Sequence, residues 1–120
     1  MATFSKLVLS GSTDGKLIKV VQTATAGTTI HTGSDTATTF DEVWLYAQNN
    51  HTADVLLTVE FGGVASPDDL IQVTVPFESG LYLVVAGLPI KGNATPLVIK
   101  AFAATANVIS IGGYVNRITA

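Results

Sequence analysis

The centre of the chain alternates between two kinds of side chain. Between residues 41 and 48, one set of alternate positions holds Val43, Leu45 and Ala47, and the other set includes Trp44 and Tyr46. Successive side chains of a β-strand point to opposite faces of the sheet, so this period of two predicts strand rather than helix. We expect the aliphatic set to face a core.

The same alternation recurs in the next two segments, 53–61 and 70–75. It predicts an antiparallel sheet with one buried and one solvated face. The residues that we expect to be buried there are Val55, Leu57, Val59, Ile71, Val73 and Val75.

Turn residues divide the whole chain into segments of this length. We expect strands at residues 4–9, 16–21, 28–32, 41–48, 53–61, 70–75, 81–86, 97–103 and 108–118. Asp14-Gly15 indicates a tight hairpin between the first two, because Gly tolerates a positive φ. Segment 81–86 is apolar on both faces, which predicts a central strand or one covered by another subunit. A loop is expected at 87–96, and Gly112-Gly113 predicts a bulge or bend.

These segments predict one all-β domain over residues 1–120. Val, Ile and Thr make up 38 of the 120 residues, and β-branched side chains favour strands. About eight short strands at this spacing predict an antiparallel β-sandwich that is jelly-roll-like, with a closed barrel as the alternative. The Thr-rich segment 23–39 is expected to be a long connection with one short exposed edge strand.

Composition excludes several classes of protein. The longest apolar stretch, residues 81–90, is half of the about 20 residues that a membrane helix needs, so we expect no membrane partner. No secretory signal is visible at the start. Cys is absent, and the net charge of −3 argues against nucleic acid as a partner.

Charge is unevenly distributed along the chain. All six basic residues lie outside segment 20–90, which holds eight of the nine acidic residues. Antiparallel pairing of basic terminal strands with acidic central strands would explain this pattern. A surface of two signs that docks on copies or on a partner is the alternative.

Catalytic and metal-binding motifs are not apparent. His31 and His51 are the only histidines, and each is expected to be solvated among Thr and polar loop residues. Adjacent carboxylates, as in Asp68-Asp69, point to opposite faces of a strand and form no dyad, and calcium needs more oxygen ligands at wider spacing. We therefore expect no enzyme activity, no cofactor and no metal site.

Few charges and two-faced apolar strands predict an oligomer, because a lone monomer would expose a large apolar surface. The candidate oligomer interface comprises Trp44, Tyr46, Tyr82 and Val84. A carbohydrate platform built on Trp44 and Tyr46 is the alternative.

Several sequence motifs resemble a family of small virion proteins of tailed bacteriophages. They are spread along nearly the whole chain, at residues 7–16, 28–32, 41–47, 57–63, 67–71 and 113–119. The resemblance implies a short β-sandwich that decorates (cements) the phage head, is typically trimeric and has no catalytic residues. It implies the major capsid protein and other copies of the chain as partners, and a place on the capsid surface after synthesis in the bacterial cytoplasm.

The candidate docking groups follow from the charge pattern and this implied role. They are Lys6, Lys16, Lys19, Asp68 and Asp69, together with the Thr-rich segment 23–39. The alternatives are a phage neck or tail protein, a carbohydrate-binding module and a host-surface adhesin.

Overall fold

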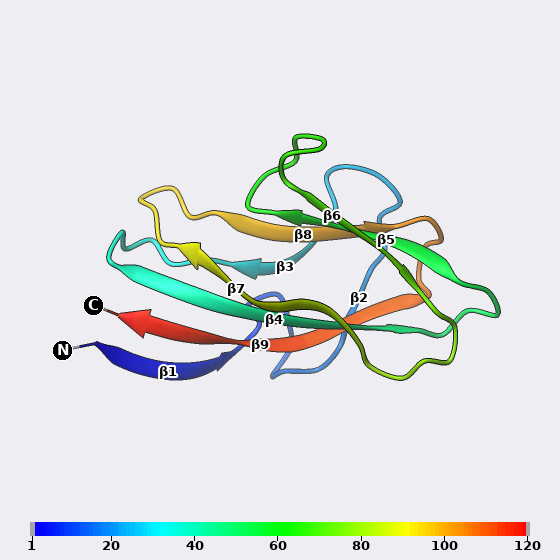
Figure 1. Ribbon diagram of the computed structural model, residues 1–120, viewed down its shortest axis with the longest axis horizontal. Coiled ribbons are helices and arrows are strands. Elements are labelled where there is room, and N and C mark those ends of the chain that lie inside the picture. Colours follow the sequence, from blue (N-terminus) through cyan, green and yellow to red (C-terminus); the bar gives the residue numbers. More distant parts are fainter. Residues whose placement is uncertain (1, 120) are drawn as a thin grey trace.

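The computed structural model describes residues 2–119, which form nine strands and no helix (Figure 1). The strands are β1 (Thr3–Val8), β2 (Ile18–Lys19), β3 (Thr28–Thr32), β4 (Thr39–Asn49), β5 (Val55–Phe61), β6 (Leu70–Val75), β7 (Tyr82–Lys91), β8 (Val98–Ala103) and β9 (Ile109–Thr119). The β-branched composition of the chain therefore translates directly into strand.

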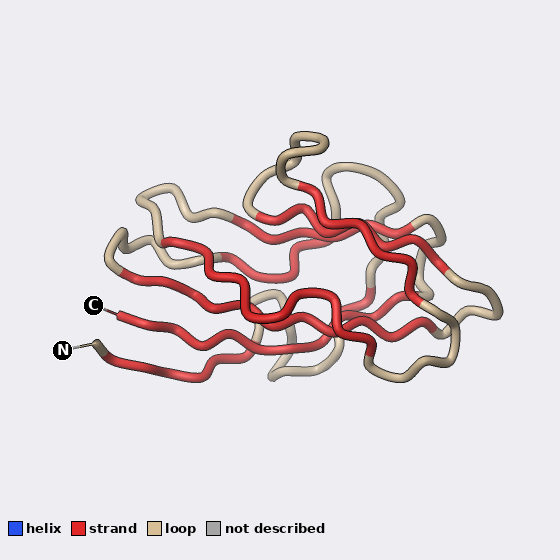
Figure 2. The backbone as a smooth tube through the Cα atoms, in the orientation of Figure 1, coloured by secondary structure: helices blue, strands red, loops and turns tan. Residues whose placement is uncertain are grey.

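Two antiparallel sheets face each other, as the two red layers of Figure 2 show. Sheet A has the order β1-β9-β4-β7, with β2 also beside β9, and sheet B has the order β3-β8-β5-β6. The chain crosses repeatedly between the sheets, since β3 and β5 lie in sheet B while β4, between them in sequence, lies in sheet A. The predicted antiparallel, jelly-roll-like sandwich is thus confirmed.

The core lies between the sheets and follows the alternation of the strands. On β4, Val43, Leu45 and Ala47 are buried, as expected. Val55, Leu57, Val59 and Val75 are buried too. Ile71 and Val73 are only partly buried, because β6 is the edge strand of sheet B and has a neighbour on one side alone.

The predicted hairpin between the first two strands is wrong. Asp14 and Gly15 do adopt positive φ values of 54° and 83°, as a tight turn requires. However, β1 and β2 do not pair with each other; both pair with β9, at residues 114–119 and 110–111 respectively. The local sequence predicts the turn at Asp14-Gly15 correctly. It does not predict that β1 and β2 each pair with β9.

Strand β7 is longer than predicted and lies at the edge of sheet A, so it is not a central strand. It continues to Lys91 through the expected loop, with two register shifts against β4. Gly87 has a φ of 72°, and a Cβ there would lie 2.9 Å from the Trp44 ring. Pro89 is tolerated because an edge strand needs no donor on its open side.

The Gly112-Gly113 pair marks a close approach instead of a bulge. Both glycines stay in continuous register with β4, opposite Tyr46 and Leu45. A Cβ on Gly113 would collide with the Trp44 carbonyl oxygen. Glycine is required here because the neighbouring backbone leaves no room for a side chain.

We expect the Leu57→Ala variant to lose about 2–5 kcal/mol of unfolding free energy, because Leu57 is 0% exposed and truncation leaves a cavity. Leu56→Ala is the matched control: the neighbouring leucine is 43% exposed on the opposite face and should cost far less. Urea unfolding measures both. Equal losses in the two variants would contradict the assigned strand phase.

Candidate functional site

The most connected polar cluster is centred on Asp41 of β4, which is fully buried. Its Oδ1 accepts a hydrogen bond from Arg117 Nε at 2.7 Å, and its Oδ2 accepts one from Arg117 Nη2 at 2.9 Å. His31 Nε2 lies 2.7 Å from the same Oδ2. The Asp41 cluster, meaning Asp41, His31 and Arg117, therefore joins β3 of sheet B to β4 and β9 of sheet A.

The hydrogen bond at Nδ1 of His31 determines which ring nitrogen carries the proton. Nδ1 accepts the backbone N–H of Ser10 at 3.1 Å. Since an acceptor nitrogen carries no proton, neutral His31 holds its proton on Nε2 and donates it to Asp41. Ser10 Oγ in turn accepts the N–H of Thr32 at 2.7 Å, so the segment after β1 is fastened to β3.

The expectation that His31 is solvated is wrong, because it is only 2% exposed. A register shift between Thr29 and His31 in the pairing of β3 with β8 breaks the period of two, so Ile30 and His31 are both buried. Simple alternation would have placed one of the two outside. His51 follows β4 and is half-buried, and its N–H donates to Asn49 Oδ1.

Burial alone would raise the pKa of the Asp41 carboxyl. The hydrogen bonds and charges of Arg117 and His31 outweigh burial and hold that pKa below its usual value of 3.8. Asp41 is therefore an ionised carboxylate at neutral pH, with its charge balanced by Arg117.

The Asp41 cluster resembles part of a hydrolytic triad but lacks the nucleophile. A triad needs a hydroxyl on the second histidine nitrogen, and here a backbone N–H occupies it. The nearby Ser10 Oγ is engaged with Thr32. The cluster can hold two sheets together; its hydrogen bonds leave His31 no position from which to accept a proton from a substrate.

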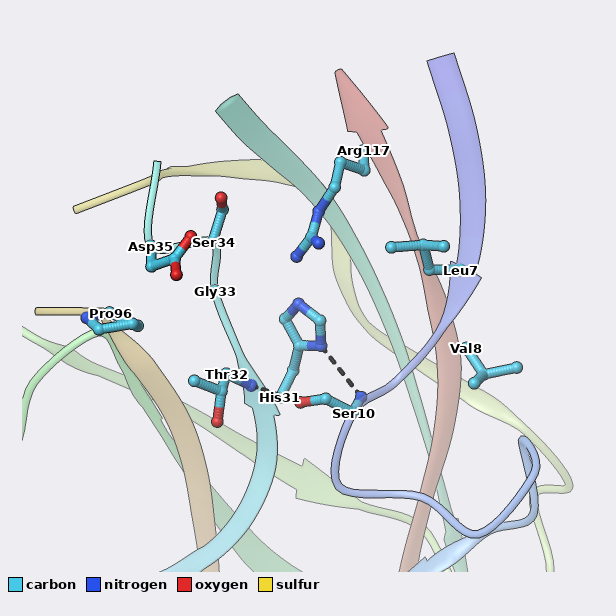
Figure 3. A pocket seen from close by; sticks show the side chains of 10 residues that line it. All are labelled: Leu7, Val8, Ser10, His31, Thr32, Gly33, Ser34, Asp35, Pro96 and Arg117. Atoms are coloured by element: carbon cyan, nitrogen blue, oxygen red, sulfur yellow. Dashed lines mark hydrogen bonds between the residues drawn. The ribbon is translucent and has the colours of Figure 1, made fainter. Parts of the chain in front are cut away.

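A cavity of about 360 Å³ opens beside the cluster (Figure 3). Figure 3 shows the Arg117 guanidinium directed toward the His31 ring, with Ser34 and Asp35 on one side and Leu7 and Val8 on the other. Because Asp41 already balances Arg117, the cavity offers no unpaired positive charge to an anion. Its walls are mostly hydroxyls, backbone and short apolar side chains.

The candidate docking residues lie on different parts of the sandwich. Lys6, Lys16 and Lys19 are all exposed, and the Lys6 ammonium sits 4.7 Å from the centre of the Tyr114 ring. The Asp68-Asp69 turn connects β5 and β6 of sheet B, and Asp69 Oδ2 accepts the N–H of Ala65 to shape that turn. Figure 1 places that connection at the top of the view and β1 at the bottom.

Opposite charges do meet across neighbouring strands, as one interpretation of the charge pattern predicts. Basic Arg117 of β9 pairs with acidic Asp41 of β4. Lys100 of β8 stands opposite Glu60 of β5 in the register. Lys6, Lys16 and Lys19 take no part in an ion pair with residues 2–119, so this pairing does not account for them.

The candidate interface residues divide between the two sides of sheet A. Trp44 and Tyr46 lie on its outer face, where Trp44 stacks on Tyr114 with ring centres 6.1 Å apart. Trp44 Nε1 and Asn116 Nδ2 donate to Glu42 Oε1, and these bonds hold the pKa of Glu42 below its usual value. Tyr82 and Val84 instead pack partly against the core, while Leu83, between them, is exposed.

The described part of the chain gathers no group of three or more His, Cys, Asp or Glu side chains that could hold a metal ion. It also contains no helix of the length and apolarity needed to cross a membrane.

Comparisons with known proteins assign no family and no function to this chain. No family model matches the chain. No curated protein and no solved structure matches it either. Function must therefore be argued from the surfaces and cavities of this sandwich.

We expect Asp41→Asn to lower the unfolding free energy at pH 7 by about 3 kcal/mol, the low end for a broken buried ion pair, because Arg117 keeps access to water. The folded-state pKa of Asp41 is depressed, so its contribution is present above the unfolded value near 3.8 and is lost as pH falls through the folded value. Urea unfolding at pH 7 and at about pH 3 should show the difference from wild type shrinking in acid.

The control for this variant is Asp35→Asn, an exposed carboxylate beside the same cavity, which should change stability by no more than about 0.5 kcal/mol. If Asp41→Asn were as stable as wild type at pH 7, the cluster would not hold the sheets together.

Proposed function

We propose that this chain is a non-enzymatic structural protein that assembles with its own copies, as a homotrimer, and decorates the head shell of a bacteriophage. The resemblance of its motifs to small virion proteins supports the virion role. The outer face of sheet A supports the assembly, and it is the observation on which the proposal depends.

That outer face is unusually apolar for a surface. Cross-strand register aligns Phe4, Ile118 and Phe40 in one row, and Val8, Tyr114, Trp44 and Ala86 in another. Phe4 is 71% exposed and Leu83 of β7 is 47% exposed. Large exposed apolar patches mark interfaces, so this face is suited to packing against a second copy of the chain.

Charges on the same face are few: Lys91 continues the row of Phe40, and a polar row lies between the two apolar rows. Lys6, Asn116, Glu42 and Pro89 form the row that separates the two apolar ones. Lys19 lies farther along, opposite Ser110. A face with both signs among aromatic side chains can fix the orientation of a partner while burial supplies the affinity.

A carbohydrate platform on Trp44 is less well supported. The Trp44 ring stacks on Tyr114, and the Tyr114 ring also carries the Lys6 ammonium. These aromatic faces are engaged with each other and with neighbouring side chains. A packing surface fits this arrangement better than a sugar platform, which needs an uncovered ring face.

Decoration would stabilise a shell by simple mass action. A protein that binds only the assembled shell favours it over the dissociated subunits. A multimer contacts several capsid subunits at once, so its avidity exceeds the affinity of one contact. A stiff sandwich loses little conformational entropy on docking.

Sedimentation of the wild-type chain at micromolar concentration should report a trimer rather than a 12.4 kDa monomer. Leu83→Glu should shift the protein toward monomer, because it places a charge in the proposed contact face. Leu56→Glu is the matched control, since Leu56 has similar exposure on the outer face of sheet B. A monomeric wild type, or equal dissociation of both variants, would contradict assembly through sheet A.

Occupancy on purified particles tests the virion role. Hundreds of copies per particle indicate decoration, whereas a dozen or fewer indicate a neck or tail protein. Reversing Lys6, Lys16 and Lys19 to Glu should reduce occupancy without unfolding the domain, since exposed charges contribute little to stability. The reduction should be larger at low salt than near physiological salt, where screening acts within about 8 Å. Full occupancy at both salts would exclude a docking role for these lysines.

A further inference from the structure

Strand β1 forms an open edge of sheet A, with β9 on one side only (Figure 1). All of its residues pair with β9 in continuous register, and none of them is Pro or Gly. Within residues 2–119, the backbone of β1 makes no hydrogen bond to any segment other than β9. Its open side therefore presents a row of unpaired N–H and C=O groups, to which another strand can add.

The other long edges of the sandwich are protected. Strand β7 carries Pro89 and two register shifts. Strand β3 has a register shift of its own, and the Gly11 N–H donates to the Ile30 carbonyl oxygen at 2.9 Å. Strand β6 lies directly between Asp69 and Pro76. Prolines, bulges, charges and covering segments are the features by which proteins prevent pairing at an edge, and β1 has the fewest of them.

Lys6 is the one charged residue of β1, and a lysine at this position often blocks an edge. Its ammonium lies 4.7 Å from the centre of the Tyr114 ring. Tyr114 belongs to β9, so the charge lies over the interior of sheet A and does not project past the open edge. The edge is therefore free to pair.

The sequence of β1 fits a second copy of itself in one register. Residues opposite each other in antiparallel strands share a face, so a twofold axis between two β1 strands places one residue opposite itself. The two registers of greatest overlap place Ser5 or Lys6 there. Lys6 opposite Lys6 brings two like charges together, which is destabilising. Ser5 opposite Ser5 instead places Lys6 opposite Phe4 of the second copy, a 71% exposed ring that attracts an ammonium.

We propose that β1 pairs antiparallel with β1 of a second copy, with Ser5 at the twofold axis, so that two five-stranded sheets A become one continuous sheet. Each β1 edge is filled by one partner, so the pairing closes and does not propagate. It uses the edge of sheet A, whereas the trimer uses the outer face, and it does not require the trimer. One strand from each copy is a small contact, so the pairing is weak in dilute solution and is favoured where copies are concentrated on a surface.

Disulfide trapping tests the register, because the chain has no cysteine of its own. In Ser5→Cys, the two cysteines would face each other at a Cα separation of about 4.5–5.5 Å, which a disulfide spans. Thr3→Cys is the matched control, since Thr3 is exposed on the same face of β1 but would lie four residues, about 13 Å, from its counterpart. Oxidised at about 1 mM, which populates complexes of submillimolar affinity, Ser5→Cys should give at least about fivefold more covalent dimer on a non-reducing gel.

A mixture of two further variants tests the strand direction. Phe4→Cys mixed with Lys6→Cys should form the mixed disulfide, because the two positions face each other only in the antiparallel register around Ser5. Intact mass spectrometry identifies this product by its mass.

Sedimentation of chains without cysteine gives a second measurement. Between micromolar and about 1 mM, the wild type should associate beyond its micromolar mass. Ser5→Lys should not, because two ammonium groups would meet at the axis, whereas Thr3→Lys, which would face Leu7 of the second copy, should associate as the wild type does. A wild type that is monomeric at micromolar concentration but associates further would contradict the trimer alone.

Three results would overturn the edge pairing. Equal yields of dimer from Ser5→Cys and Thr3→Cys would show random collision. Lys6→Cys alone giving more dimer than Ser5→Cys would place a different residue at the axis. Further association of Ser5→Lys equal to that of the wild type would assign the contact to another surface.

Discussion

A single buried carboxylate holds the two sheets of this sandwich in register. Asp41 accepts hydrogen bonds from β9 and β3, and His31 passes the connection on to the segment after β1. An ionised group inside a protein is tolerated only when its charge and its hydrogen-bonding positions are met, so β3, β4 and β9 cannot shift relative to one another without breaking the cluster. A shifted register would leave the buried charge of Asp41 without its partners, which is costly inside a protein.

The local alternation of apolar and polar residues predicts most of the strands and their buried faces. The predictions that are wrong have physical causes. Val43, Leu45 and Ala47 face the core as a period of two requires. Asp41 obeys the same phase, yet nothing in a neighbouring residue shows that its partner is Arg117, which lies 76 positions away. The burial of His31 is not predicted by alternation, because a bulge in β3 buries two consecutive residues. The strand predicted at residues 81–86 is shorter than β7, because Gly87 and Pro89 usually indicate a loop and are tolerated in a strand only at an open edge. Pairing of distant strands, which sequence spacing does not encode, decided each of these cases.

The outer faces of the two sheets differ in how much of each is covered by other segments of the chain. On sheet B, the segment leading into β3 lies close enough for the Gly27 N–H to reach Glu60, so Thr58 and Glu60 are buried on a nominally outer face. On sheet A, Phe4, Val8, Phe40 and Leu83 remain exposed beside half-buried aromatic side chains. The chain therefore covers part of one sheet by itself and leaves the other apolar. An exposed apolar surface of the second kind is what self-assembly uses.

Asp41 and Glu60 are two buried carboxylates whose hydrogen-bond partners differ. Both carboxylates are completely buried on long-range paired strands. Asp41 accepts three hydrogen bonds from charged or polar side chains, which leaves it complete without any ligand. Glu60 accepts one, from a backbone amide, while its nearest basic neighbour in the register makes no ion pair with it. If burial of a carboxylate served only to fix strand register, Lys100 would close on Glu60 as Arg117 closes on Asp41. The chain instead covers Glu60 with the segment that leads into β3, and the Gly27 N–H of that segment is the one hydrogen-bond donor that Glu60 meets among residues 2–119.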